Sequence, residues 1–121
     1  MEKLQGGISV DDRGLLRYVN GFDMSKIKRF YQVENFDLKT VRAFHGHMKE
    51  EKFVFVTSGT LLVCLVKLTD KEKPSKNEPV ERVVVSARNP QIIIIPSGYA
   101  NGFKALEKKT SAIFFSIVGI L

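Results

Sequence analysis

The stretch that decides the fold is KFVFVTSGTLLVCLVKL, residues 52–68. It is rich in Val, Leu and Phe, which favour β-strands, and the pair Ser58-Gly59 near its middle is a turn signal. Successive side chains of a strand point to opposite faces, so Lys52, Val54 and Val56 share one face. The stretch therefore predicts two strands, 52–58 and 60–68, with a lysine at the start of a valine-lined face.

The rest of the chain has the same pattern of short apolar runs separated by turn residues. No stretch has the 3.6-residue period of an amphipathic helix of ordinary length. The run Ile92–Ile95 is apolar at every position, as expected for a strand that is covered on both faces. Many short strands at this spacing predict an all-β sandwich or barrel. The candidate strands are Leu15–Val19, Lys28–Val33, Thr40–Phe44, Lys52–Ser58, Thr60–Leu68, Glu81–Ser86, Gln91–Ile95, Asn101–Ala105 and Ser111–Ile117.

Length and charge limit the classes of protein. The 121 residues suit one domain, so we expect a single domain over residues 1–121 with an exposed loop around residues 69–79. The net charge is +6, but the lysines form only short, interrupted groups, which is typical of a solvated surface. No basic and aromatic residues combine as in single-strand-binding proteins, and no apolar run approaches the roughly 20 residues of a membrane span. We therefore expect neither nucleic acid nor a membrane as a partner.

Two features indicate the compartment. The single cysteine, Cys64, lies within an apolar run, and we expect it to be a buried small side chain in a reducing environment. The first ten residues lack the basic start and apolar stretch of a secretory signal. We therefore expect a cytoplasmic protein.

Two segments contain the residues with catalytic or binding chemistry. They are VRAFHGHMKEEK, residues 41–52, and IPSGYANGF, residues 95–103. Together they resemble the two motifs of the cupin superfamily, in which three histidines and a glutamate hold one divalent ion. In this chain His45 and His47 are present, but the carboxylate position falls on Lys52 and the third histidine position on Asn101. A protonated lysine offers a cation no lone pair, so we predict that this pocket holds no metal.

The lysine resembles that of one branch of the superfamily, the dTDP-4-dehydrorhamnose 3,5-epimerases. That family has an Arg-Gly-Leu-His segment, a Lys-Leu-Val strand and an Ile-Pro-x-Gly-Phe-Ala-His-Gly-Phe segment. The matching segments are Arg42-Ala-Phe-His45, Lys52-Phe-Val54, Ile95–Phe103 and, near the N-terminus, Asp12-Arg13-Gly14; the resemblance covers about residues 8–116. The His-Gly-His pair resembles instead the related dTDP-4-keto-6-deoxyhexose 3,4-ketoisomerases. The resemblance implies a cupin-type β-barrel, or jelly roll, of two packed antiparallel sheets with almost no helix.

The resemblance also implies roles for single residues. His45 would be the base that removes a proton beside a ketone, Lys52 would stabilise the enolate, and His47 would be a second base or an orienting group. The alternatives are interior histidines satisfied by their neighbours, and a lysine at the barrel rim. The residues expected to bind substrate are Arg42, Asn101, Arg13 and Tyr99, and Tyr99 is also a candidate for packing in the pocket wall.

The implied function is that of an epimerase or ketoisomerase of a nucleotide-linked, dTDP-type, 4-keto-6-deoxyhexose in deoxysugar and cell-surface polysaccharide biosynthesis, without a cofactor. The epimerases protonate the enolate with a tyrosine that follows the last barrel strand, and no tyrosine follows Tyr99 here. Two alternatives therefore stay open: a non-catalytic cupin that binds sugar nucleotides, and a metal-dependent small-molecule cupin. Epimerases of this type pair through N-terminal strands, so we expect a homodimer with Phe30–Phe36 at its contact.

Overall fold

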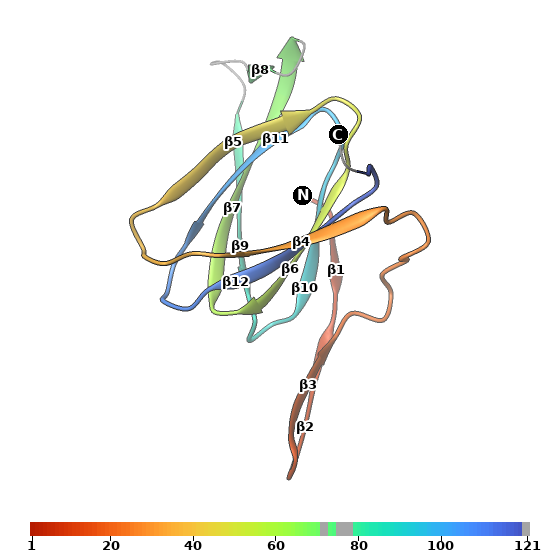
Figure 1. Cartoon of the computed structure of the whole chain (residues 1–121), viewed down its shortest axis with the longest axis vertical. Helices are drawn as coiled ribbons and strands as arrows, with labels where there is room; N and C mark the ends of the chain where they lie inside the picture. Colours follow the sequence, from red (N-terminus) through yellow and green to blue (C-terminus); the bar gives the residue numbers. More distant parts are fainter. Residues whose placement is uncertain (71–72, 75–78, 120–121) are drawn as a thin grey trace.

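The computed structural model describes residues 1–70, 73–74 and 79–119, and within these ranges it describes every side chain except those of residues 47, 69, 70, 73 and 74. The described residues form twelve strands and no helix (Figure 1). The strands are β1 Lys3–Gln5, β2 Gly7–Asp11, β3 Gly14–Tyr18, β4 Arg29–Glu34, β5 Val41–His47, β6 Lys52–Ser58, β7 Thr60–Asp70, β8 Lys73–Pro74, β9 Val80–Ser86, β10 Gln91–Ile95, β11 Tyr99–Ala105 and β12 Ser111–Ser116. The described part of the chain therefore contains no helix that could cross a membrane.

Two antiparallel sheets pack face to face and form the body of the molecule. The first has the strand order β1-β10-β6-β12-β4, and the second has β5-β11-β7, with β9 and the short β8 also paired to β7. The predicted all-β fold of two packed antiparallel sheets is confirmed. The barrel is not closed, because β4 and β5 are the edge strands of their sheets and do not pair with each other.

The core fills the space between the two sheets. Register pairs Val54 with both Phe114 and Ile93, so their side chains lie on the same inward face of the first sheet. Burying each such side chain contributes about 1.5–3 kcal/mol. Ile92 and Ile93 are both buried, so β10 is covered on both faces as its sequence predicts. The largest fully buried hydrophobic side chains are Phe114, Leu61, Leu65, Ile93, Ile95, Val54, Val56, Val63 and Val85.

Most strands lie where the sequence predicts them, with differences at their ends. Lys52–Ser58 and Gln91–Ile95 have the predicted bounds. The sequence reading missed β1 and β2, which are short and separated by glycines.

Cys64 is only partly buried, which corrects the expected full burial, because alternation along β7 buries its neighbours Val63 and Leu65 on the inward face. The loop expected around residues 69–79 lies partly outside the described residues; its described part includes the end of β7 and the two residues of β8, which pair with each other.

The hairpin of β2 and β3 extends away from the two-sheet body (Figure 1). Arg17 joins it to the body, since its Nε donates a hydrogen bond of 2.7 Å to the carbonyl oxygen of Ala87. Its apolar side chains are largely exposed, with Val10 at 72% and Leu16 at 63%. Exposed apolar residues gathered on one projecting element are typical of a surface that contacts another molecule.

Candidate active site

A cavity of about 290 Å³ opens between the two sheets at the edge where β4 and β5 face each other. Its lining residues are Tyr31 and Val33 of β4, Arg42 and His45 of β5, Lys52 of β6, and Asn101 and Phe103 of β11. The structure thus brings together four residues that the sequence predicts for the site: Arg42, His45, Lys52 and Asn101.

A β-bulge explains how Arg42 and His45 line the same cavity. They are three residues apart, and regular alternation would point them to opposite faces. In the pairing of β5 with β11, however, Asn101 lies opposite His45 and Phe103 lies opposite Arg42, so two residues of β5 oppose the single Gly102 of β11 between these points. The extra residue reverses the alternation, and both side chains face the same side.

Gly102 allows the two strands to approach closely at this bulge. A Cβ atom at this position would lie 2.9 Å from the Cβ of Ala43 and 3.3 Å from the carbonyl oxygen of Arg42. Any side chain there would push β5 away from β11. Gly102, the second glycine of the motif IPSGYANGF, is therefore required for β5 to lie this close to β11.

The polar side chains at the mouth of the cavity are exposed, and those deeper inside are not. Arg42 and His45 are exposed, and the Nε of Arg42 donates a hydrogen bond of 3.1 Å to the Oδ1 of Asn35. The amide of Asn101 is buried, and the side chain of Lys52 is 13% exposed. The site therefore has a cationic mouth and an inner wall that holds an ammonium group.

Glu50 lies behind Lys52 and is a functional candidate that the sequence reading missed. Its Oε1 lies 3.6 Å from the Nζ of Lys52, and its Oε2 lies 3.3 Å from the Nη2 of Arg29. The Oγ of Ser116 also donates a hydrogen bond of 2.5 Å to Oε2. Glu50 precedes β6, where no alternation rule applies, so no sequence pattern predicts its inward direction.

Tyr31 is the second candidate that the sequence reading missed. Its ring stacks on Phe114, with centroids 5.3 Å apart and an interplanar angle of 4°, and the guanidinium carbon of Arg29 lies 5.1 Å from its centroid. Burial, and then the negative charge of Glu50, raise the pKa of Tyr31 above 10, although Arg29 opposes them. The phenol is therefore protonated at neutral pH and available as a proton donor. Tyr31 and Val33 are two residues apart on β4, so strand alternation predicts that both side chains point to the same face. This is the sequence signal that could have identified Tyr31.

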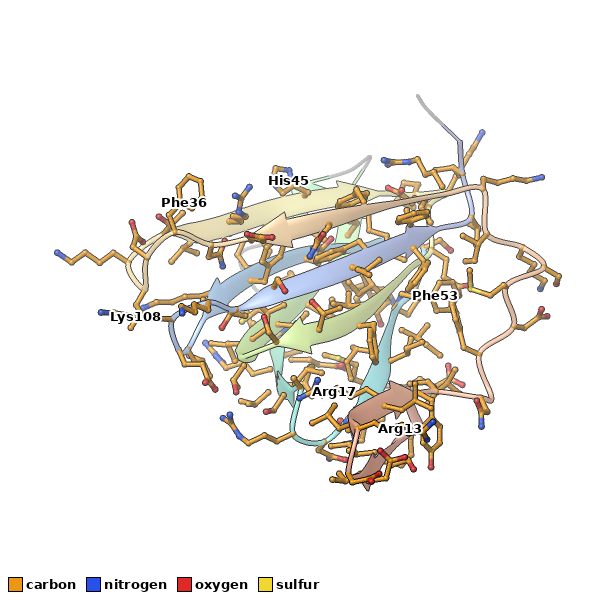
Figure 2. All side chains as sticks on the ribbon, turned by 60° about the horizontal axis from the view of Figure 1, so that its bottom comes forward. Arg13, Arg17, Phe36, His45, Phe53 and Lys108 are labelled. Carbon is orange, nitrogen blue, oxygen red and sulfur yellow. The ribbon has the colours of Figure 1, made fainter. Side chains whose placement is uncertain are left out.

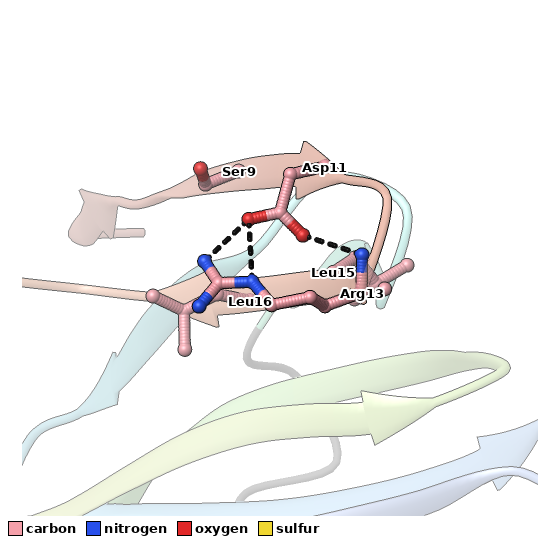
Figure 3. Close-up of a pocket in the computed structure, with 6 residues that line it drawn as sticks. Ser9, Asp11, Arg13, Leu15 and Leu16 are labelled. Carbon is pink, nitrogen blue, oxygen red and sulfur yellow. Dashed lines mark hydrogen bonds and ion pairs between the residues drawn. The ribbon is translucent and has the colours of Figure 1, made fainter.

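Two residues predicted for the site lie elsewhere, and the side chain of a third is not described. Arg13 lies on the hairpin, at the far side of the molecule from His45 (Figure 2). Its guanidinium and backbone N–H bind the carboxylate of Asp11 (Figure 3), and these hydrogen bonds hold the pKa of Asp11 below its usual value. Tyr99 packs against the core and lines a separate recess with Pro96. The side chain of His47 lies outside the described ones.

The donor set of this cavity suits proton transfer better than metal binding. Among the described residues, no three His, Cys, Asp or Glu side chains lie close enough to hold a metal ion. The ammonium of Lys52 and the amide of Asn101 stand where a carboxylate and an imidazole would complete such a site. An imidazole, an ammonium and a phenol around one cavity can remove a proton, stabilise an enolate and return a proton.

Comparison with known proteins places the chain among sugar-nucleotide isomerases. A sequence model described as dTDP-4-dehydrorhamnose 3,5-epimerase matches residues 10–117. The spore coat polysaccharide biosynthesis protein SpsL of Bacillus subtilis is 28% identical over 109 residues, which are 88% of this chain and 71% of SpsL.

Solved structures share the fold at low sequence identity. The rmlC epimerase of Mycobacterium tuberculosis has a TM-score of 0.75 at 18% identity over 98% of this chain, and the chain spans only 64% of that protein's length. The dTDP-4-dehydrorhamnose 3,5-epimerase of Bacillus anthracis, with TDP and pyrophosphate bound, has a TM-score of 0.78 at 20% identity, covering 98% of this chain and 73% of that one. The QdtA 3,4-ketoisomerase of Thermoanaerobacterium thermosaccharolyticum, in complex with TDP, has a TM-score of 0.72 at 18% identity, covering 99% and 81%.

Proposed function

Since the chain belongs to the dTDP-4-dehydrorhamnose 3,5-epimerase family, we propose that it is an epimerase or ketoisomerase of a nucleotide-linked 4-keto-6-deoxyhexose. The observation that carries the proposal is the cavity between β4 and β5, whose lining includes His45, Lys52 and Tyr31. These are the three kinds of group that proton transfer beside a ketone requires.

Each group has one step in the proposed reaction. His45, as the neutral imidazole, takes the proton from the carbon beside the ketone. The electron pair of the broken C–H bond moves into the ketone, and the ammonium of Lys52 stabilises the resulting enolate oxygen. A proton then returns to carbon, and the enolate electrons form the new C–H bond.

Tyr31 is the group that we assign to the returning proton. It comes from β4 in the first sheet, whereas His45 comes from β5 in the second, so the two side chains approach the cavity from opposite sheets. Inverting a carbon requires removal of a proton from one face and its return to the other, and this arrangement suits that requirement. The phenol of Tyr31, whose pKa lies above 10, is protonated before the step. The approach of Tyr31 and His45 from opposite sheets favours an epimerase over a ketoisomerase.

Arg42 is suited to the nucleotide part of the substrate. Its guanidinium is exposed at the mouth of the cavity and oriented by Asn35. An arginine fork matches the oxygens of a diphosphate better than a lysine does.

The relatives with TDP bound support thymidine as the nucleoside, and the relation to SpsL supports a role in polysaccharide biosynthesis. We place this activity in the cytoplasm.

A homodimer is the assembly that we propose. β4 and β5 each have one free edge, and Phe30 and Phe36 beside these edges are 67% and 102% exposed. A second copy would cover these rings, and the apolar hairpin of β2 and β3 offers a further contact. Sedimentation at micromolar concentration should give the mass of a dimer, and a single monomeric species would contradict this.

Binding of dTDP, deuterium exchange and the metal content of the purified protein separate the three candidate functions. Binding of dTDP, measured by calorimetry, is expected for the epimerase and for a non-catalytic sugar-nucleotide module but not for a metal-dependent small-molecule cupin. Incorporation of solvent deuterium into a dTDP-4-keto-6-deoxyhexose is expected for the enzyme alone. Binding without exchange would replace the enzymatic proposal with the binding module, and a stoichiometric divalent ion with no dTDP binding would replace it with the metal cupin.

A further inference from the structure

Glu50 is a buried carboxylate that contacts the cavity lysine without lining the cavity. Its side chain is 6% exposed. Among the described side chains it contacts Arg29 of β4, Ser116 of β12 and Lys52 of β6. In the register of the first sheet, Ser116 pairs with Arg29 on one side and with Lys52 on the other. One carboxylate therefore joins a polar row across three adjacent strands, at the end of an otherwise apolar face.

The charges of this row leave one positive charge for a ligand. Arg29 and Lys52 contribute two cations, and Glu50 contributes one anion. An enolate that forms beside Lys52 would meet this excess charge next to an ammonium whose side chain is only 13% exposed, where charges interact more strongly than in bulk water. Without Glu50, the two cations would repel each other, and the ammonium of Lys52 would lose the contact that fixes its direction.

Arg29 also connects Glu50 to Tyr31. The guanidinium that binds Glu50 also lies over the Tyr31 ring, which in turn stacks on the ring of Phe114. Among the described side chains, the Nε of Arg29 is the buried polar atom without a hydrogen-bond partner. The contact of its Nη2 with Glu50 is therefore the polar contact that we expect to hold the guanidinium over the Tyr31 ring.

We propose that Glu50 is a positioning residue, which fixes the Lys52 ammonium at the cavity and, through Arg29, the ring of Tyr31. Glu50 itself touches no substrate, because it lies behind Lys52 and outside the cavity lining. The inference rests on the proposed function, since it deepens the roles given there to Lys52 and Tyr31.

The test combines kinetics with a readout that does not depend on activity. Glu50→Gln keeps the shape of the side chain and removes its charge, and Glu50→Asp keeps the charge on a shorter side chain. Glu107→Gln is the matched control, because Glu107 forms an ion pair with Arg88 away from the cavity. The measurements are kcat and KM for solvent deuterium exchange into a dTDP-4-keto-6-deoxyhexose, and the rate at which acetic anhydride labels Lys52, followed by peptide mass spectrometry.

We expect Glu50→Gln to lower kcat about 10²-fold, as misplaced catalytic groups do, with KM nearly unchanged. Glu50→Asp should fall between this variant and the wild type. Labelling of Lys52 should be faster in Glu50→Gln than in the wild type, and Glu107→Gln should match the wild type in both measurements. Wild-type kcat together with wild-type labelling in Glu50→Gln would overturn the inference.

The outcomes keep this inference separate from the proposed function. A wild type without exchange activity would refute the proposed function, while the labelling rates would still decide whether Glu50 fixes Lys52. If Glu50→Gln does not fold, Ser116→Ala tests the same row, because it removes the hydrogen bond to Glu50 and keeps all three charges. A lowered kcat and faster labelling in Ser116→Ala would support the inference, and wild-type values of both would assign Glu50 to stability alone and overturn it.

Discussion

Replacing Gly102 with alanine should damage the site without changing any group that acts on substrate. The new Cβ would lie 2.9 Å from the Cβ of Ala43, whereas ordinary contacts begin at 3.4 Å, so β5 and β11 must move apart by about 0.5 Å. Overpacking of this kind typically costs about 1–3 kcal/mol. For a domain of this length, each kcal/mol lowers Tm by about 4 °C, so we expect a fall of about 4–12 °C.

The same displacement should slow the reaction. Arg42 and His45 reach the cavity only through the bulge beside Gly102. A misplacement of about 1 Å costs about 10²-fold in rate, so a shift of half that size should cost about tenfold. Calorimetric melting and the deuterium-exchange rate measure the two effects.

Two variants sharpen this prediction. Ala43→Gly in the Gly102→Ala background removes the nearest of the atoms that the new Cβ meets, and it should restore part of the lost Tm and rate. Gly21→Ala is the control, because a Cβ there meets nothing within 4 Å, and it should change stability by less than about 0.5 kcal/mol. If Gly102→Ala keeps the wild-type Tm and rate, the bulge does not set the geometry of the site.

Three further predictions concern the core, the proton donor and an exposed ion pair. Phe114→Ala should cost about 3–5 kcal/mol in urea unfolding, because the ring is fully buried and stacks on Tyr31; a loss below about 1 kcal/mol would contradict the packing. Tyr31→Phe should slow inversion of the carbon, measured by product analysis, by about 10²–10⁴ with dTDP affinity retained, and a wild-type rate of inversion would remove Tyr31 as the acid. Hydrogen bonds from Arg88 and Thr60 hold the pKa of Glu107 below 4.5, so this carboxylate stabilises the fold above pH 4.5 and the contribution is lost as pH falls through the folded-state pKa. The difference in urea midpoint between wild type and Glu107→Gln should therefore be present at pH 7 and shrink towards zero in acid; a difference that persists in acid would show that it does not come from the charge.

The sequence predicts the residues of the site that follow simple strand alternation. Lys52 starts a face of valines, and the structure places it on the inward face of β6 beside Val54. Alternation alone would separate Arg42 from His45, and their shared direction depends on a bulge that only the pairing with β11 reveals. In that case the family resemblance succeeded where periodicity could not.

The residues that the sequence reading missed depend on tertiary contacts. Glu50 lies in a connection before β6, and two of its partners, Arg29 and Ser116, are distant from it in sequence. Tyr31 was overlooked because the family tyrosine follows the last strand, whereas this one reaches the cavity from β4. Arg13 forms a local pair with Asp11 within its turn, and a motif alone could not tell whether such a turn lies near the cavity.

The central claim is that His45 removes a proton from the carbon beside a ketone in the cavity between β4 and β5. The most direct measurement is deuterium incorporation from D₂O into dTDP-4-keto-6-deoxyglucose, followed by NMR for the wild type and for His45→Asn. The wild type should incorporate deuterium beside the ketone. His45→Asn should be slower by about 10²–10⁴, with dTDP affinity nearly unchanged because the base acts mainly in the transition state. Full exchange by His45→Asn, or no exchange by the wild type with any nucleotide-linked 4-keto-6-deoxyhexose, would contradict the claim.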